Sequence, residues 1–303
     1  MRLKSLGEER TGVELSCTVA NKEEGFVVVG GAKVHYERAG TGYPLVLLHG
    51  LVGSARNWRS NIDFLARYAN VFALDLCNMG ESDRVPGLDS SLEATADRIA
   101  ATMDALGLRE ADIAGHSHGG AIAMMLAARH PVRVRRLILF APANPYCDLG
   151  RHLIRFYQTR FGVWFAKQIP FFPRMLKAVA LSRMYGDPKR VPDQALEGYI
   201  GGLHVPGTVD HILSIVRGWS TDMTHLRGVL AQLAEKPTLM IWGDRDRAVG
   251  LASARQLGRA LKRSSLLVLP GVGHIAFEEM PDICNKAMSD WLSSPLPKSR
   301  SAA

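Results

Sequence analysis

Short, mostly apolar runs recur from residue 45 onward and are separated by longer stretches of helical character. Strands that are apolar on both faces belong to a parallel sheet covered by helices on both sides. Helices are expected between them at Leu92–Leu106 and Ala121–Arg129, where strong helix formers dominate and Pro131 ends the second. The six expected strands are Leu45–Leu48, Val71–Leu74, Asp112–Ala114, Leu137–Phe140, Leu239–Trp242 and Leu266–Leu269.

Two further β-rich runs precede this alternation. Phe26–Val29 and Lys33–Arg38 are separated by Gly30 and Gly31, which predicts an antiparallel hairpin. The predicted fold class is therefore α/β, with a mostly parallel, doubly wound sheet of about eight strands that begins with this hairpin.

The alternation breaks between residues 144 and 236. This stretch has many aromatic side chains and several Pro or Gly interruptions but no apolar β-run, so we expect a helical cap inserted between the sixth and seventh strands of the sheet. The core would then comprise residues 25–143 and 237–293. Residues 1–24 and 294–303 are expected to be loosely ordered ends.

Composition excludes several classes of protein. With 47% hydrophobic and 22% charged residues the chain has enough apolar side chains for a packed core. The net charge of +8 is accompanied by no nucleic-acid motif, so we expect no nucleic-acid partner. No apolar run reaches the ~20 residues of a membrane-spanning helix, and no signal peptide is recognisable. Because the four cysteines have neither metal nor disulfide spacing, we expect no metal site and a cytoplasmic location.

The strongest chemical signal is the run from Gly115 to Gly120, which reads Gly-His-Ser-His-Gly-Gly. It fits the G-x-S-x-G pattern, and it lies between an expected strand and an expected helix, as that pattern requires. Glycine on both sides of Ser117 permits a sharp strand-to-helix turn. The sequence therefore predicts Ser117 as a catalytic nucleophile.

A serine nucleophile requires a histidine base and a carboxylate that orients it. Among ten histidines, His274 follows the last expected strand, so it would lie at the same edge of the sheet as Ser117. The turn after the preceding strand offers two carboxylates, Asp244 and Asp246, and the order Ser, Asp, His is the one typical of this arrangement.

An acyl-transfer site also needs hydrogen-bond donors for the oxyanion. The backbone N–H of His118, directly after the nucleophile, is the first expected donor. The second is expected from the loop after the third strand, where Gly50 and Gly53 permit close approach and the N–H of Leu51 is the best candidate. His49 would orient this loop.

Together these motifs resemble the α/β-hydrolase superfamily, and within it a capped, serine esterase-like branch with a short His-Gly oxyanion loop. The resemblance covers residues 25–293 and implies, through the family's G-x-x-D pattern, that Asp246 is the acid and Asp244 a turn residue. The matching pieces are His49-Gly50 with Trp58, Asp75 with Gly80-Glu81-Ser82, the Gly115–Gly120 run, Gly243–Asp246, and Gly273-His274 with Glu279-Met280-Pro281.

Two positions depart from the family pattern. Cys77-Asn78 stands where relatives usually carry Pro-Gly, and asparagine tolerates the left-handed backbone better than other non-glycine residues. His118 stands where relatives often carry Met, Leu or Gln. Its imidazole could either line the acyl pocket or pack beneath the cap.

The identity of the nucleophile limits which reactions are expected. Epoxide hydrolases and haloalkane dehalogenases of this fold use aspartate at the elbow, whereas this chain has Ser117. The resemblance therefore implies hydrolysis of a small-molecule ester through an acyl-enzyme, without a cofactor. The same triad also serves C–C bond, lactone and amide hydrolysis and perhydrolysis, and some relatives are ligand-binding receptors. The intact triad favours an enzyme.

The cap is the best clue to the substrate. Tyr157, Phe161 and Trp164 fall at helical spacing, so they either pack the cap onto the core or form an aromatic acyl pocket. Residues 151–190 also hold nine Lys or Arg against a single acid, Asp187. This surplus favours acidic substrates or peripheral contact with an anionic lipid surface. The oligomeric state does not follow from the sequence.

Overall fold

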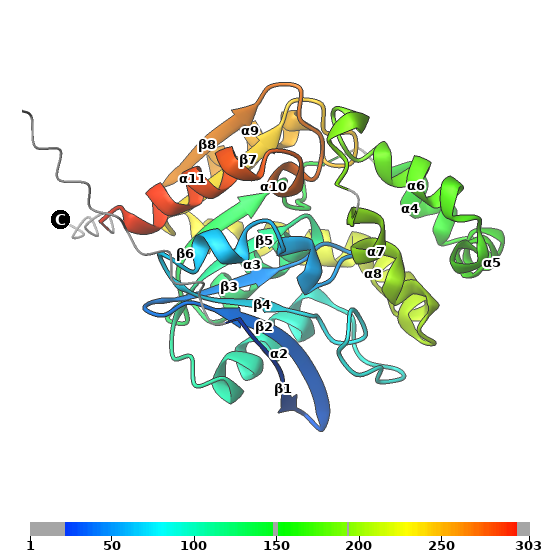
Figure 1. The fold of residues 1–303 in the computed structure, drawn as a ribbon, viewed down its shortest axis with the longest axis horizontal. Helices are drawn as coiled ribbons and strands as arrows, with labels where there is room; N and C mark the ends of the chain where they lie inside the picture. Colours follow the sequence, from blue (N-terminus) through cyan, green and yellow to red (C-terminus); the bar gives the residue numbers. More distant parts are fainter. Residues whose placement is uncertain (1–21, 148–150, 193, 296–303) are drawn as a thin grey trace, which may run out of the picture.

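An eight-stranded sheet crosses the molecule in the order β1-β2-β4-β3-β5-β6-β7-β8 (Figure 1). This computed structural model describes residues 22–147, 151–192 and 194–295. β1 and β2 pair antiparallel, β2 pairs antiparallel with β4, and all other neighbours are parallel, which confirms the predicted fold class. The strands are β1 (Glu23–Val29), β2 (Ala32–Ala39), β3 (Pro44–Leu48), β4 (Asn70–Leu74), β5 (Ala111–His116), β6 (Val134–Phe140), β7 (Thr238–Gly243) and β8 (Ser264–Leu269).

The hairpin turn depends on glycine. Gly30 and Gly31 both have positive φ, +57° and +84°, the conformation that tight two-residue hairpin turns require. β1 starts at Glu23, two residues before the predicted beginning of the core. Residues 1–21, most of the expected loose N-terminus, lie outside the described part of the chain, as do residues 296–303.

Apolar side chains fill both faces of the sheet. Along β3, Val46 and Leu48 join one buried cluster, whereas Leu45 and Leu47 join the other. This alternation is the consequence of the two-residue period of a strand. The first cluster is covered by α2 (Leu92–Ala105), α3 (His118–Arg129) and α9 (Leu251–Ala260), and the second by η1 (Ala55–Trp58), α1 (Ile62–Leu65), α10 (Ala276–Glu279) and α11 (Pro281–Ser293).

In the described part of the chain between β6 and β7 all the regular elements are helices, and α4, α5 and α6 project away from the sheet (Figure 1). We call the elements from α4 to η4, together with the start of α8, the cap. The elements are α4 (Arg151–Tyr157), α5 (Arg160–Gln168), η2 (Ile169–Phe171), α6 (Arg174–Ser182), η3 (Pro188–Arg190), α7 (Ala195–Ile200), η4 (Gly201–His204), α8 (Thr208–Val229) and η5 (Leu230–Leu233).

The end of this insertion belongs to the core. Leu226 near the end of α8, with Leu230 and Leu233 of η5, is buried in the same apolar cluster as Val46 and Leu48 of β3. The long helix α8 therefore begins in the cap and ends beneath the sheet. The predicted boundaries between core and cap at residues 144 and 236 stay a prediction, because residues before 236 pack into the core.

Candidate active site

Ser117 occupies a strained turn between β5 and α3. Its backbone has φ +53° and ψ −117°, an unusual combination for a residue with a side chain. The turn is tight enough that a Cβ atom on Gly115 would come within 2.4 Å of the Gly119 carbonyl oxygen. A Cβ on Gly119 would lie equally close to the His49 carbonyl oxygen. Both glycines of the pattern are thus required by close backbone contacts.

Asp246 and His274 meet at the carboxyl edge of the sheet, after β7 and β8. Asp246 Oδ2 lies 2.8 Å from His274 Nδ1 and accepts its proton in a hydrogen bond. Asp246 Oδ1 accepts the backbone N–H groups of Ala248 and Val249 at 2.8 and 2.9 Å, so the carboxylate is fixed by three donors. Because Nδ1 donates to Asp246, Nε2 of a neutral His274 is left as the basic nitrogen.

Asp244, the competing carboxylate, lies on the surface. Its Oδ1 accepts the backbone N–H of Gly271 at 2.7 Å, which stabilises the turn after β8. The structure therefore places Asp246, and not Asp244, against the histidine.

His116 joins the serine turn to the histidine loop. Its ring centroid lies 4.6 Å from that of His274, and its Nε2 donates to the His274 carbonyl oxygen at 3.1 Å. Burial, with the neighbouring His274, lowers the pKa of His116 well below its ordinary value. His116 is thus a neutral spacer that holds the histidine loop beside Ser117.

The loop after β3 approaches the same serine. A Cβ on Gly50 would come within 3.4 Å of the Ser117 Cβ, so the loop packs directly against the turn. Within the described residues, the backbone N–H groups of Leu51 and His118 form no hydrogen bond with another backbone group. These are the two donors expected for an oxyanion.

His49 fixes this loop from below. Its Nδ1 donates to the Gly50 carbonyl oxygen at 2.8 Å, and its Nε2 accepts the N–H of Leu76 at 3.1 Å. Both bonds require the neutral imidazole, and complete burial lowers the pKa of His49 accordingly. The contacts match the structural role expected for His49.

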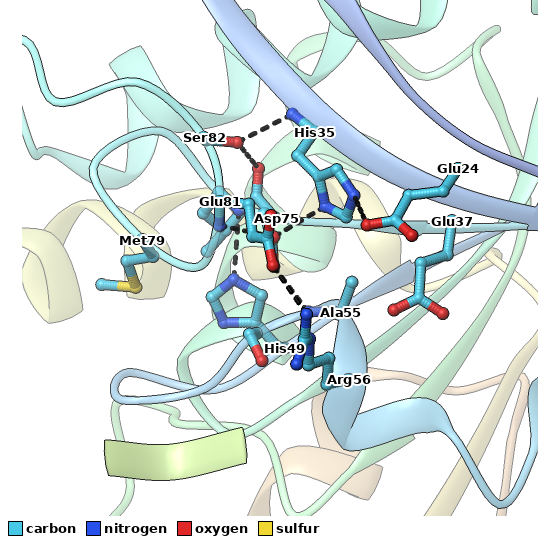
Figure 2. A network of polar contacts seen from close by, with 12 residues as sticks. Glu24, His35, Glu37, His49, Ala55, Arg56, Asp75, Met79, Glu81 and Ser82 are labelled. Carbon is cyan, nitrogen blue, oxygen red and sulfur yellow. Dashed lines mark hydrogen bonds and ion pairs between the residues drawn. The ribbon is translucent and has the colours of Figure 1, made fainter. Parts of the chain in front are cut away.

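A buried network behind the loop surrounds Asp75 (Figure 2). Asp75 Oδ1 accepts the N–H of Ala55 at 2.6 Å, and Oδ2 accepts that of Glu81 at 2.8 Å and a bond from His35 Nδ1 at 2.8 Å. His35 Nε2 lies 2.9 Å from a carboxylate oxygen of Glu24. The network therefore ties the end of the oxyanion loop to β1, β2 and the turn after β4.

Asp75 and His35 favour each other's charged forms within this network. Burial opposes ionisation of Asp75, but the hydrogen bond from His35 and the backbone donors outweigh it and lower the pKa of the carboxyl group. Burial likewise disfavours the charged imidazole, yet Asp75 and Glu24 raise the pKa of His35. Gly80 is essential here, because a Cβ at this residue would come within 2.1 Å of the Asp75 carboxyl group.

The Cys77-Asn78 departure preserves the turn. Asn78 adopts φ +67°, the left-handed conformation that asparagine was expected to tolerate. Its amide also bonds to both backbone polar groups of Val85 and lies 3.1 Å from His211 Nδ1 of α8. The substitution therefore adds a link between this loop and the cap.

The side chain of His118 is buried between α3 and α8. Its ring stacks on Trp219 with centroids 6.2 Å apart, and neither ring nitrogen has a hydrogen-bond partner among the described residues. Burial lowers its pKa to about 3, so the imidazole is neutral. The ring therefore packs against Trp219 in the middle of α8. The two roles expected for it, lining the acyl pocket and packing beneath the cap, stay predictions.

Two adjacent glutamates, which sequence reasoning left without a role, link the cap to the histidine loop. Glu279 Oε2 accepts the N–H groups of Gly273 and Gly186 at 2.7 and 2.9 Å, and Oε1 accepts that of Asp187 at 3.0 Å. The N–H of His274 itself donates to the Met184 carbonyl oxygen at 2.7 Å. Their place four and five residues after His274 was the signal available in the sequence.

Glu278 makes the second set of bonds. Its carboxylate accepts the hydroxyl protons of Tyr185 and Tyr199 from the cap, at 3.1 and 2.9 Å, and pairs with Arg59 from the core at 2.8 Å. Burial raises its pKa despite these partners. The cap is therefore fastened to the loop that carries His274.

The aromatic residues expected in the cap lie differently from the prediction. Phe161 and Trp164 are 62% and 57% exposed and contact each other, with ring centroids 5.6 Å apart. Tyr157 is half-buried and packs edge-on against Phe156. Both alternatives, an acyl pocket and packing onto the core, required Phe161 and Trp164 to face inward. They do not, because α5 turns its small residues Gly162 and Ala166 toward the protein.

Two cavities open between the loop after β4 and the cap, one beside α8 and one beside α7 and η4. One of about 630 Å³ is lined by Asn78, His211, Ser214 and Arg84, among others, and one of about 510 Å³ by Ser54, Asp75 and Gly198, among others. Burial lowers the pKa of His211 to about 4. Across the described ranges, no three His, Cys, Asp or Glu residues are grouped as metal ligands, and no helix has the length and apolar character needed to cross a bilayer.

The chain is similar to several known proteins over most of its length. The chain is 30% identical to the dihydrolipoyllysine-residue acetyltransferase component of the acetoin cleaving system of Pseudomonas putida, over 87% of this chain and 68% of that protein. It is 27% identical to 2-hydroxymuconate semialdehyde hydrolase of a Pseudomonas strain, over 82% and 86%. A meta-cleavage product hydrolase structure from Pseudomonas fluorescens has the same fold, with a TM-score of 0.74 at 24% identity over 88% and 96%. Residues 43–281 match the model of the alpha/beta hydrolase fold family, and the chain belongs to that family.

Proposed function

We propose that this chain is a serine hydrolase that cleaves a carboxylic ester through an acyl-enzyme. The observation that carries the proposal is the pairing of a strained serine turn with a histidine whose Nδ1 is held by buried Asp246. Nothing in this arrangement requires a metal or cofactor. We assign Ser117 as nucleophile, His274 as base and Asp246 as the acid.

The proposed reaction runs in two halves. Ser117 Oγ attacks the ester carbonyl carbon while His274 Nε2 takes its proton, and the carbonyl electrons move onto oxygen. Collapse of this intermediate expels the alcohol, which receives the proton from His274. Water then repeats the sequence on the acyl-enzyme and releases the acid. Asp246 stabilises the imidazolium at both stages without becoming protonated.

The oxyanion is stabilised by backbone donors. The N–H groups of His118 and Leu51 are assigned to it, because Gly50 and Gly119 allow the two segments to pack closely around Ser117. Each such donor contributes about 2.7–4 kcal/mol of transition-state stabilisation in comparable sites. The position of the donors is maintained by His49 and Asp75.

Substitution of the nucleophile tests the proposal. We expect Ser117→Ala to lower kcat for an aryl ester by about 10⁶-fold, because the members of a triad act as a unit. A fluorophosphonate probe should label the wild-type protein and not the variant, with both showing the same circular dichroism. A folded Ser117→Ala protein that keeps more than a few per cent of activity would exclude Ser117 as nucleophile.

Hydrolysis of a carbon–carbon bond is the second candidate. It is favoured by the relative named 2-hydroxymuconate semialdehyde hydrolase, which aligns along most of its length. A panel of aryl esters of increasing chain length, run beside a vinylogous diketone acid, separates the two. A kcat/KM for the diketone well above that of every ester would replace the ester proposal. A lactone and an anilide added to the panel would detect lactone or amide hydrolysis, and binding without turnover would indicate a receptor.

The location of the protein and its partners stay predictions. We propose a cytoplasmic enzyme that acts on a small molecule and has no nucleic-acid partner, on the basis of the cysteine usage and the motif content of the chain.

A further inference from the structure

The outward side of α5, η2 and α6 is apolar, although these elements lie at the surface of the cap. Phe171 and Met175 are 78% and 77% exposed, more than the aromatic pair of α5. In Figure 1 these helices project away from the sheet. We call the exposed apolar set the outer cap face; its members are Phe161, Trp164, Phe171, Met175, Leu176 and Val179.

In helix α6 apolar side chains face outward and a charged side chain faces inward. Met175, Leu176 and Val179 are exposed, whereas Lys177 and Leu181 are buried and the Lys177 ammonium donates to the Pro170 carbonyl oxygen at 2.9 Å. A surface helix normally turns its apolar stripe inward and its charges outward. Large exposed apolar patches on a folded protein mark sites of interaction. The exposed apolar side of α6 is therefore a candidate for contact with a partner.

The charge around the outer cap face is positive. The acidic groups near these helices are already paired, Asp210 with Lys167 at 2.8 Å and Glu197 with Arg174 at 3.3 Å. Two further guanidinium groups, those of Arg160 at the start of α5 and Arg183 at the end of α6, are exposed and form no ion pair with any residue the structure describes. The partner must therefore accept both apolar side chains and an excess of cations.

We propose that the outer cap face docks onto the surface of an anionic lipid bilayer. Aromatic and aliphatic side chains beside Lys and Arg are the composition of interfacial helices, in which apolar groups enter the acyl boundary and cations meet the headgroups. A second copy of the chain fits less well, since it would oppose cations with cations. Docking of this kind is independent of catalysis at Ser117.

Vesicle binding tests this inference on the full chain. Wild-type protein should cosediment with vesicles containing phosphatidylglycerol and stay in the supernatant with phosphatidylcholine alone, and added salt should weaken binding. Trp164, which stays in place in the variants, should shift its emission to the blue on binding. Phe171→Ser with Met175→Ser should lower the partition coefficient by about tenfold or more. Arg160→Gln with Arg183→Gln should lower it by about tenfold.

A matched pair of substitutions controls for lost apolar surface. Val28 and Val132 are 64% and 79% exposed on the core, and Val28→Ser with Val132→Ser should leave vesicle binding unchanged. The inference would be overturned if both double serine variants lost vesicle binding equally, or if the wild-type protein did not bind anionic vesicles. So would a dimer that dissociates in the Phe171→Ser, Met175→Ser variant, which would make the face a contact between copies. Unchanged melting temperatures exclude unfolding as the cause.

Discussion

Single residues at the active site differ sharply in what surrounds them, and the two carboxylates of the turn after β7 illustrate this. Asp246 is buried and bonded to His274 and two backbone N–H groups, whereas Asp244 bonds to Gly271 at the surface. Their roles are separable, because an amide at one site would change the histidine tautomer and at the other only weaken a turn.

We expect Asp246→Asn to lower kcat by about 10⁴-fold, since the amide favours the tautomer with the proton on the wrong nitrogen of His274. Asp244→Asn should change kcat by less than about tenfold, because Oδ1 of the amide still accepts from Gly271. Steady-state kinetics on one ester measures both. The reverse order would make Asp244 the catalytic acid.

Among the residues that the structure describes, His118 has two buried side-chain nitrogens without a hydrogen-bond partner. Two buried nitrogens without a protein partner destabilise the fold by about 1–3 kcal/mol relative to paired groups. We therefore expect His118→Leu, of similar volume, to raise the free energy of unfolding by about 1 kcal/mol in urea titrations. The backbone N–H assigned to the oxyanion is retained in this variant. A loss of stability would show instead that the imidazole has a partner in solution.

The loop between β8 and α10 is held by contacts from other parts of the chain. The Glu279 carboxylate accepts the N–H of Gly273 in this loop and two N–H groups of the cap. Gly186 and Gly273 have no side chain, which allows the two backbone segments to pack closely. The position of His274 is thus set by the cap as well as by the core.

Glu279→Gln should test this positioning role. The amide replaces one acceptor by a donor that faces N–H groups, so we expect kcat to fall about 10- to 100-fold with little change in KM. Glu278→Gln is the matched control: it weakens bonds to Tyr185 and Tyr199 without touching Gly273, and should lower the melting temperature more than kcat. Equal losses of kcat in the two variants would reduce Glu279 to a structural role. The rate of fluorophosphonate labelling gives an independent reading of His274 alignment.

The sequence predicted the elements better than their mutual contacts. The apolar runs, the Gly30-Gly31 turn and the turn at Ser117 are local patterns, and the structure has a strand or turn at each. The contact of His35 with Asp75 arises from pairing of β2 with β4, which no local pattern specifies. Helical spacing likewise grouped Phe161 with Trp164, but it does not say which way a stripe faces.

The free energy of unfolding should depend on pH because of the buried network around Asp75. The raised pKa of His35 contributes stability that is complete below its ordinary value of 6.5 and is lost as pH rises through the folded pKa. The lowered pKa of Asp75 contributes stability above 3.8 that is lost as pH falls through its folded pKa. Both contributions are present together between these two ordinary values.

His35→Asn isolates this effect. The difference in unfolding free energy between wild type and variant should be larger at about pH 5.5 than at about pH 9, because the stabilisation by the charged imidazole is lost as pH rises through the raised pKa of His35. Urea titrations at both pH values measure the difference, and other titrating groups cancel in the comparison. A difference that grows toward alkaline pH would mean that neutral His35 is the stabilising form.

Helix α8 is held at both ends. Its 22 residues span about 33 Å, with Leu226 buried beneath the sheet and Thr208 and His211 bonded to the loop after β4. A continuous helix cannot bend sharply without losing backbone hydrogen bonds. We therefore expect room for a bulky substrate to come from the joints between the short helices α4 to α7, while the position of α8 stays unchanged.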